Sequence, residues 1–112
     1  KINKKLFTSK LNSWKKKKFD LSIYDRVLYL LSEKEVRDHF KKYKKFMKNL
    51  IIDDFHNSEY SENNMTYSTK NYEIILIDYG FKLKKNEPSE HIIGNEKFFK
   101  RNARRLIFEK IR

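Results

Sequence analysis

The strongest structural signal in this sequence is a helix start at Ser32 that a long apolar stripe follows. Ser32 and Glu35 have the spacing of a capping box, in which each side chain accepts a hydrogen bond from the other residue's backbone N–H. The apolar residues that follow recur at helical spacing and fall on one arc of a helical wheel. They are Val36, Phe40, Tyr43, Met47, Leu50 and Ile51. We therefore predict one long amphipathic helix from Ser32 to the end of this stripe.

Helical patterns also cover both flanking regions. Asp20 or Ser22 can cap a helix that runs to about Leu31. Towards the other end, Asn95 can cap a final helix over residues 96–112. The apolar arc of this final helix would consist of Phe99, Ala103, Leu106 and Ile107. Its basic residues would occupy the opposite arc, facing solvent or a partner.

The segment 70–79 fits two kinds of secondary structure. It can form a helix that ends at Gly80, because glycine is favoured just after helices. Its apolar run, residues 74–77, also fits a buried strand, because periodicity does not separate the two for so short a run. We favour the helix. Beyond it, residues 81–85 and 90–94 are predicted to pair as a short hairpin.

Together these elements predict a mainly α fold: a small bundle of three to four helices with one short β-hairpin before the C-terminal helix. The polar, aperiodic residues 56–69 are predicted to form a loop. At 112 residues the chain has the size of one domain. We assign residues 1–18 to a basic N-terminal arm or helix and residues 19–112 to a single helical domain.

Charge is concentrated at the two ends of the chain. The formal net charge is +12. Residues 1–18 contain eight lysines and no acidic residue, and residues 97–112 contain seven basic residues and one acidic residue. A field of this kind attracts polyanions and acidic surfaces. A lysine excess is also what the codons of an AT-rich genome produce, so part of the charge can be solvated surface.

We therefore expect non-enzymatic binding of a polyanion, with RNA in a ribonucleoprotein particle such as a ribosome as the favoured partner. Lysine neutralises phosphates, arginine binds them bidentately, and an aromatic ring can stack on an unpaired base. The candidates are the lysine run Lys15, Lys16, Lys17 and Lys18, the helix face Lys41, Lys45 and Lys48, and the C-terminal cluster Arg101, Arg104, Arg105 and Phe108. The sequence thus predicts a basic, helical, RNA-binding ribosomal protein.

The alternative interpretation is a protein-interaction module. Phe7, Leu11 and Trp14 lie at the spacing of one helical stripe on a basic background. Phe108 lies among arginines on the predicted final helix, where it can contact a partner protein. Basic amphipathic helices of this kind can dock on an acidic partner or on a membrane surface.

Several chemistries are excluded or disfavoured. The chain contains no cysteine, which excludes disulfides, thiolate-bound metals and thiol catalysis. His39, His56 and His91 are too far apart in sequence for a helical metal site, and we predict no metal or cofactor. No apolar run approaches the ~20 residues that a membrane-spanning helix needs. Residues 1–18 resemble organelle transit peptides in their lack of acids, so we expect an intracellular protein and leave an organellar location open.

Asp53, Asp54 and His56 stand together at the end of the predicted long helix. They can form a carboxylate–imidazole pair or simply a polar helix end. Acidic residues at a helix C-terminus oppose the helix dipole, so their position there is unusual.

Residues 70–93 resemble the core of HicA-type toxin ribonucleases, with a helix, Gly80-Phe81, basic strand residues, a turn and His91. In that family a Gly-Ser-His stretch carries the catalytic histidine. The resemblance implies a small ribonuclease that uses His91. In this chain a Gly-Ser pair does not directly precede His91, and we expect a protein that is not an enzyme.

Overall fold

The computed structural model describes residues 19–66, 68–90 and 102–111 of the chain. Over these ranges the chain is a mixed α/β protein, and the predicted helical bundle is wrong. The elements in chain order are β1 (Phe19–Asp25), η1 (Leu28–Leu30), α2 (Glu33–Tyr43), η2 (Lys44–Phe46), β2 (Met47–Phe55), α3 (Tyr72–Ile77), β3 (Phe81–Pro88) and β4 (Ala103–Lys110). The elements η1 and η2 are single turns of 3-10 helix.

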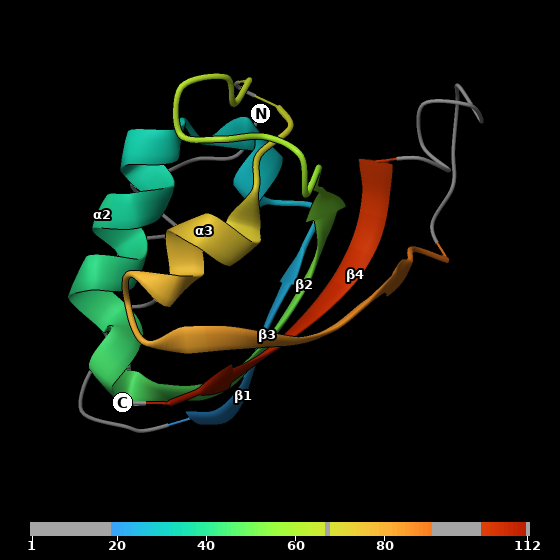
Figure 1. The fold of residues 1–112 in the computed structure, drawn as a ribbon. Coiled ribbons are helices and arrows are strands. Elements are labelled where there is room, and N and C mark those ends of the chain that lie inside the picture. The colour runs from blue at the N-terminus through green and yellow to red at the C-terminus, as the bar shows by residue number, and fades with distance from the viewer. Residues whose placement is uncertain (1–18, 67, 91–101, 112) are drawn as a thin grey trace.

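The four described strands form one sheet in the order β1-β2-β4-β3. The neighbours β1 and β2 are parallel, and the chain crosses between them through η1 and α2, because parallel neighbours need a long crossover. The strand β4 runs antiparallel to both β2 and β3. Figure 1 shows α2 and α3 on the same face of this sheet. The carboxyl ends of β1 and β2 therefore meet at one end of the sheet, beside the beginning of β4.

The apolar core lies between the sheet and the two helices. Alternate residues of β2 and β4 point towards the helices because side chains alternate along a strand. The fully buried core residues on these strands are Leu50, Ile52, Leu106 and Phe108, and those on the helices are Val36, Phe40, Tyr72, Ile75 and Leu76. These residues lie far apart in sequence, so the core depends on the complete set of strand pairings.

The predicted capping box is confirmed, but the helix that follows it is shorter than predicted. Ser32 Oγ accepts a hydrogen bond from the Glu35 N–H at 3.1 Å, and Glu35 Oε1 accepts one from the Ser32 N–H at 2.9 Å. The helix α2 ends at Tyr43 and β2 begins at Met47. Strand pairing on both sides of β2 outweighs the helical stripe, since Ile51 and its β-branched neighbour Ile52 pack well on a sheet.

The predicted C-terminal helix is also wrong, because residues 103–110 form β4. Leu106 and Phe108 are both fully buried, at the two-residue spacing of a strand. Phe108 was the residue that did not fit the basic arc of a helix, and it lies in the core. The rest of that prediction, from residue 96 to residue 101, lies outside the described residues.

Two further predictions fail in part. The predicted helix from Asp20 or Ser22 to Leu31 is replaced by β1 and the short turn η1. The predicted strand 81–85 exists within β3, where it pairs with β4. Of its predicted partner, residues 90–94, residues 91–94 lie outside the described residues.

The favoured helix within residues 70–79 is confirmed as α3. Asn71 Oδ1 accepts hydrogen bonds from the N–H groups of Glu73 and Ile74, at 3.1 and 3.5 Å. Gly80 follows the helix with a φ of 89°, in the left-handed region that favours glycine. Residues 57–66 form turns and irregular backbone, as predicted for this loop.

Among the described residues, helices cover only one face of the sheet. On the other face, Leu21 and Ile23 of β1 are 50% and 64% exposed. They lie beside Asn49 and Ile51 of β2 in the strand register. In the described part of the chain, the helices are too short or too polar for any of them to traverse a lipid bilayer.

We predict that Phe108→Ala lowers the free energy of unfolding by about 3–5 kcal/mol, because it removes a buried aromatic ring and leaves a cavity. The control is Ile111→Ala, at a side chain that is 52% exposed, and its effect should stay within about 0.5 kcal/mol. Urea unfolding followed by circular dichroism measures both values. Equal losses in the two variants would contradict the placement of Phe108 in the core.

Candidate functional site at the carboxyl ends of the parallel strands

The end of the sheet where β1 and β2 terminate gathers most of the buried polar side chains. In open α/β sheets, ligands bind outside the carboxyl ends of parallel strands. Here Arg26 follows β1, Asp53 and Asp54 close β2, and His56 comes next. Asp53, Asp54 and His56 are all buried. This end of the sheet is therefore the place to look for a functional site.

Arg26, Asp53 and Ser89 form a closed network on the sheet face that no described helix covers. Arg26 Nε donates to Asp53 Oδ1 at 3.1 Å, and its Nη2 donates to Ser89 Oγ at 3.0 Å. Ser89 Oγ in turn donates to the same Asp53 oxygen at 2.7 Å. The Arg26 guanidinium also lies over the Phe55 ring, 5.0 Å from its centroid. The network ties the end of β1 and the residue after β3 to the central strand.

The backbone of Arg26 is strained. Its φ is 53°, in the left-handed region where a non-glycine residue costs about 1–3 kcal/mol. This conformation turns the chain out of β1, and the Arg26 N–H donates to the Asp53 carbonyl at 2.8 Å. Such strain is found more often at functional sites than elsewhere.

Asp54 and Lys70 hold the crossover on the helix-covered side of the sheet. Asp54 Oδ2 accepts from the N–H groups of Leu28 and Tyr29 at 3.0 and 3.2 Å, and its Oδ1 accepts from the Phe55 N–H at 2.8 Å. Lys70 Nζ donates to the Leu28 carbonyl at 3.4 Å. Burial raises the pKa of Asp54 to about 6 and lowers the pKa of Lys70 to about 8, while the attraction between the two charges acts against both shifts.

His56 has one satisfied and one unsatisfied ring nitrogen. Its Nδ1 accepts a hydrogen bond from the Tyr72 N–H at 3.1 Å. Its Nε2 is buried and has no hydrogen-bond partner among the described residues. Burial, reinforced by the positive charge of Arg104, lowers the pKa of His56 to about 4, so the ring is neutral near pH 7. The Tyr72 ring stacks on His56 with centroids 6.2 Å apart, and its hydroxyl is also buried without a partner in the described structure.

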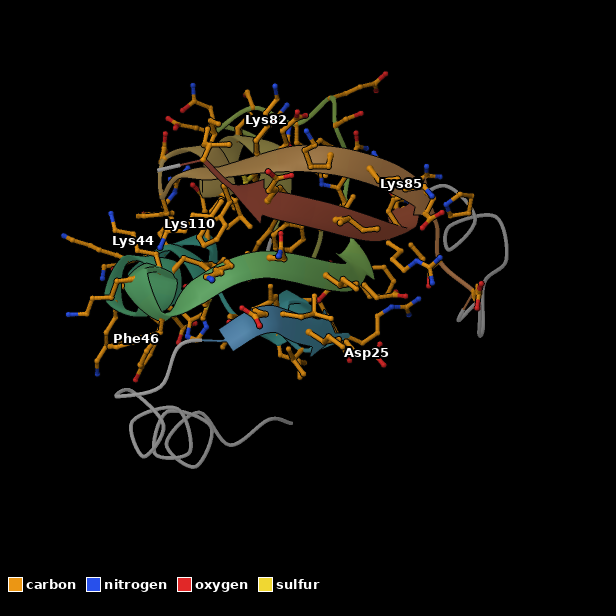
Figure 2. All side chains as sticks on the ribbon, turned by 90° about the horizontal axis from the view of Figure 1, so that it is seen from below. Asp25, Lys44, Phe46, Lys82, Lys85 and Lys110 are labelled. Carbon is orange, nitrogen blue, oxygen red and sulfur yellow. The ribbon has the colours of Figure 1, made fainter. Side chains whose placement is uncertain are left out.

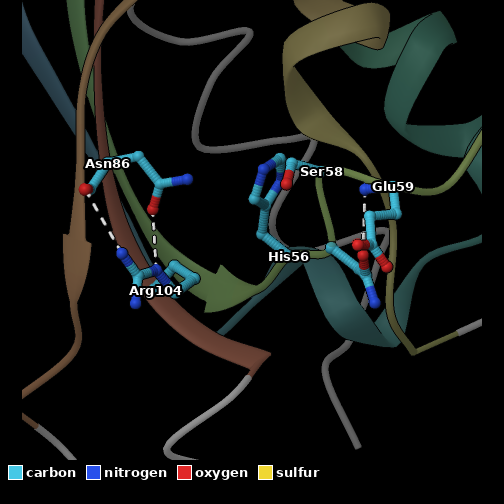
Figure 3. Close-up of a pocket in the computed structure, with 6 residues that line it drawn as sticks. His56, Ser58, Glu59, Asn86 and Arg104 are labelled. Carbon is cyan, nitrogen blue, oxygen red and sulfur yellow. Dashed lines mark hydrogen bonds between the residues drawn. The ribbon is translucent and has the colours of Figure 1, made fainter.

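His56 borders a polar cavity of about 250 Å³. The lining residues are His56, Asn57, Ser58, Glu59, Asn86 and Arg104. Arg104 is held by Asn86, whose Oδ1 accepts from Nε at 2.7 Å and whose carbonyl accepts from Nη2 at 3.3 Å. Figure 3 shows the His56 ring between this Arg104–Asn86 pair and the loop that carries Ser58 and Glu59.

The comparisons with known protein families and with curated proteins find no match to this chain. The site is therefore defined by its own geometry alone.

The arginines and lysines that the sequence analysis named as polyanion-binding candidates lie in different parts of the structure. Arg104 lines the cavity, whereas Arg105 forms an ion pair with Glu87 at 2.8 Å. The helix-face lysines Lys41, Lys45 and Lys48 are exposed near the end of α2 and the start of β2. Phe108 is fully buried, so its ring is not available to a base or a partner protein. The lysine run Lys15–Lys18, Arg101, His91 and the stripe Phe7, Leu11 and Trp14 lie outside the described residues.

The pKa shifts in the fold make opposite contributions to stability in acid. His39, half-buried on α2, accepts or donates a hydrogen bond with the Tyr24 hydroxyl at 2.7 Å, and burial lowers its pKa to about 4, as for His56. In the unfolded chain both rings take up protons below about pH 6.5. The unfolded state therefore binds more protons between pH 6.5 and 4, which destabilises the fold as the pH falls. Asp54 makes the opposite contribution between about pH 6 and 4. As the pH falls, the folded state takes up the Asp54 proton before the unfolded state does, which stabilises the fold.

We predict that the free energy of unfolding falls by roughly 3 kcal/mol between pH 7 and pH 4.5. His39 and His56 each lower the free energy of unfolding by roughly 3 kcal/mol over this range, and Asp54 raises it by about as much as one histidine lowers it. The variant Asp54→Asn keeps an acceptor oxygen but cannot titrate, so its stability should fall more steeply with acid. Urea unfolding at a series of pH values measures both slopes. A stability that is constant or higher at pH 4.5 would refute the prediction.

Proposed function

We propose that this chain is a ligand-binding α/β domain that takes a small polar molecule at the carboxyl ends of β1 and β2. The observation that carries the proposal is the convergence of Arg26, Asp53, Asp54 and His56 at this one end. It supports a site because charged and strained groups are costly to bury, and such groups gather where proteins bind ligands.

A purely structural role explains only part of this arrangement. The Arg26–Asp53–Ser89 network and the Asp54 contacts brace the chain where it leaves the strands. A purely structural set of hydrogen bonds requires neither a cavity nor a buried donor that lacks an acceptor. Two observations favour a ligand: the cavity beside His56, and its buried Nε2, which has no hydrogen-bond partner among the described residues. An unsatisfied buried polar group costs about 1–3 kcal/mol.

We predict that at least one small polar compound causes saturable backbone amide shifts at residues 25–28, 53–58, 86–89 and 102–104. The probe is a panel of nucleotides, amino acids and short carboxylic acids, added to ¹⁵N-labelled protein. Amides of residues 44–49, at the other end of β2, serve as the internal control and should not move. A panel that leaves the first group unshifted would exclude the proposed site for these ligand classes.

A second candidate function is polyanion binding by the opposite end of the molecule. Figure 2 shows Lys44 and Lys110 at the end remote from Asp25, and Lys110 Nζ donates to the Lys44 carbonyl at 2.7 Å. In the described part of the chain, Lys41 and Lys45 have no carboxylate partner, whereas Lys48 lies 3.5 Å from Asp20. The helical, RNA-binding and ribosomal description is not retained, because the fold is mixed and neither family nor curated comparisons support it.

For this second function we predict that Lys45→Glu weakens binding to heparin and lowers the slope of log K against log[NaCl] by about 1. The matched control is Lys34→Glu, which changes the charge equally but replaces a lysine already paired with Asp38 at 2.7 Å. Heparin titrations at several salt concentrations give both slopes. If the two variants weaken binding equally, the effect comes from net charge alone and not from a site.

A further inference from the structure

We propose that the cavity beside His56 binds the carboxylate group of a small molecule. This inference rests on the proposed function, because it names the ligand chemistry at the same end of the sheet. Two residues that line the cavity carry N–H donors, His56 through its ring and Arg104 through its guanidinium. Each is fixed in place by neighbours that the ligand does not need to touch.

The donor on His56 follows from its hydrogen bonding. Nδ1 accepts from the Tyr72 N–H, so this nitrogen carries no proton. In a neutral imidazole the proton must then lie on Nε2, which becomes a donor. The side chain is only 2% exposed, and it lines the cavity with Nε2 unpartnered among the described residues. A ligand oxygen that accepts this hydrogen bond satisfies the His56 ring nitrogen that the described residues leave without a partner.

Arg104 supplies the second donor and the positive charge. Asn86 accepts two of its N–H groups, through the side-chain oxygen and the backbone carbonyl. The remaining N–H groups are not used by the described residues. Asn86 of β3 pairs with Leu106 of β4, two residues from Arg104, and its two hydrogen bonds orient the guanidinium. A planar guanidinium in a fixed orientation suits a planar carboxylate, which it can bind through two parallel hydrogen bonds.

The size and the charge of the cavity restrict the ligand further. The cavity of about 250 Å³ is several times the ~30 Å³ that a water molecule occupies in the liquid, so it has room for a carboxylate together with a short stem. Glu59 also lines the cavity. Its negative charge opposes the doubly charged form of phosphate more strongly than a singly charged carboxylate. The cavity is therefore expected to prefer a carboxylate over inorganic phosphate.

The test follows the ring nitrogens of histidine in ¹⁵N-labelled protein at pH 7. Before any addition, His56 should carry its proton on Nε2. Sodium acetate should then shift the His56 Nε2–H and the Arg104 side-chain signals in a saturable way, at lower concentration than sodium phosphate. Sodium chloride at equal ionic strength should shift neither. His39 is the internal control, because its ring hydrogen-bonds to Tyr24 and does not line the cavity.

Two pairs of measurements separate the site from general charge effects. Arg104→Gln should weaken acetate binding at least tenfold, while Arg105→Gln, at the neighbour paired with Glu87, should leave it unchanged. Glu59→Gln should narrow the preference for acetate over phosphate. A proton on Nδ1 of His56, equal effects of the two arginine variants, or a response to chloride overturns the carboxylate site.

The result also distinguishes this inference from the broader proposal. If compounds shift the amides around Arg26 and Asp53 while His56 and Arg104 stay unchanged, the carboxylate site is wrong and the ligand-binding end of the sheet stands. If acetate shifts His56 and Arg104 together, the carboxylate site is supported and the ligand lies on the helix-covered side of β2.

Discussion

The fold depends on β2, a strand paired along both of its edges. It forms parallel pairs with β1 on one side and antiparallel pairs with β4 on the other. Its helix-facing side chains Leu50 and Ile52 are fully buried. At its end, Asp54 accepts hydrogen bonds from Leu28 and Tyr29, which sets the start of the crossover to α2. Burying the central strand therefore determines both the core and the position of the polar groups at its end.

Local signals in the sequence predicted the parts of the fold that depend on local hydrogen bonds. The Ser32–Glu35 capping box and the cap of α3 at Asn71 need only a few neighbouring residues, so their residue types were enough. The end of α2 was not predicted because the apolar spacing up to Ile51 fits a helix equally well. Only pairing with β1 and β4, which lie far away in sequence, decides that residues 47–55 form a strand.

Phe108 shows how a misfit in one pattern can indicate another. On a helical wheel its ring lay among arginines, and a ligand-binding role was predicted to account for it. With strand spacing it shares a face with Leu106, and both residues are buried. In the same way, the unusual acidic pair Asp53 and Asp54 at a supposed helix end was a sign of a strand end. Alternation places one carboxylate on each face of the sheet.

The residues of the candidate site were only partly accessible to sequence reasoning. Asp53, Asp54 and His56 were noticed as a group because they are adjacent in sequence. Arg104 was a candidate because of its charge, but its position beside a cavity was not predicted. Arg26 and Ser89 are brought together across 63 positions, and no pattern in either segment indicates the other. The positive φ of Arg26 was equally hidden, because arginine does not favour that conformation.

The sheet face that no described helix covers has a consequence for the polar groups at the strand ends. Leu21 and Ile23 of β1 are exposed beside Ile51 of β2, on the face of the sheet that no described helix covers. Asp53 is two residues beyond Ile51 on the same face. Any protein segment or partner that packs on these apolar side chains therefore also covers the Arg26–Asp53–Ser89 network. Removing water there strengthens the charge attractions within the network. Occupancy of this face of the sheet would thereby alter how firmly Arg26 and Ser89 are held against the end of β2.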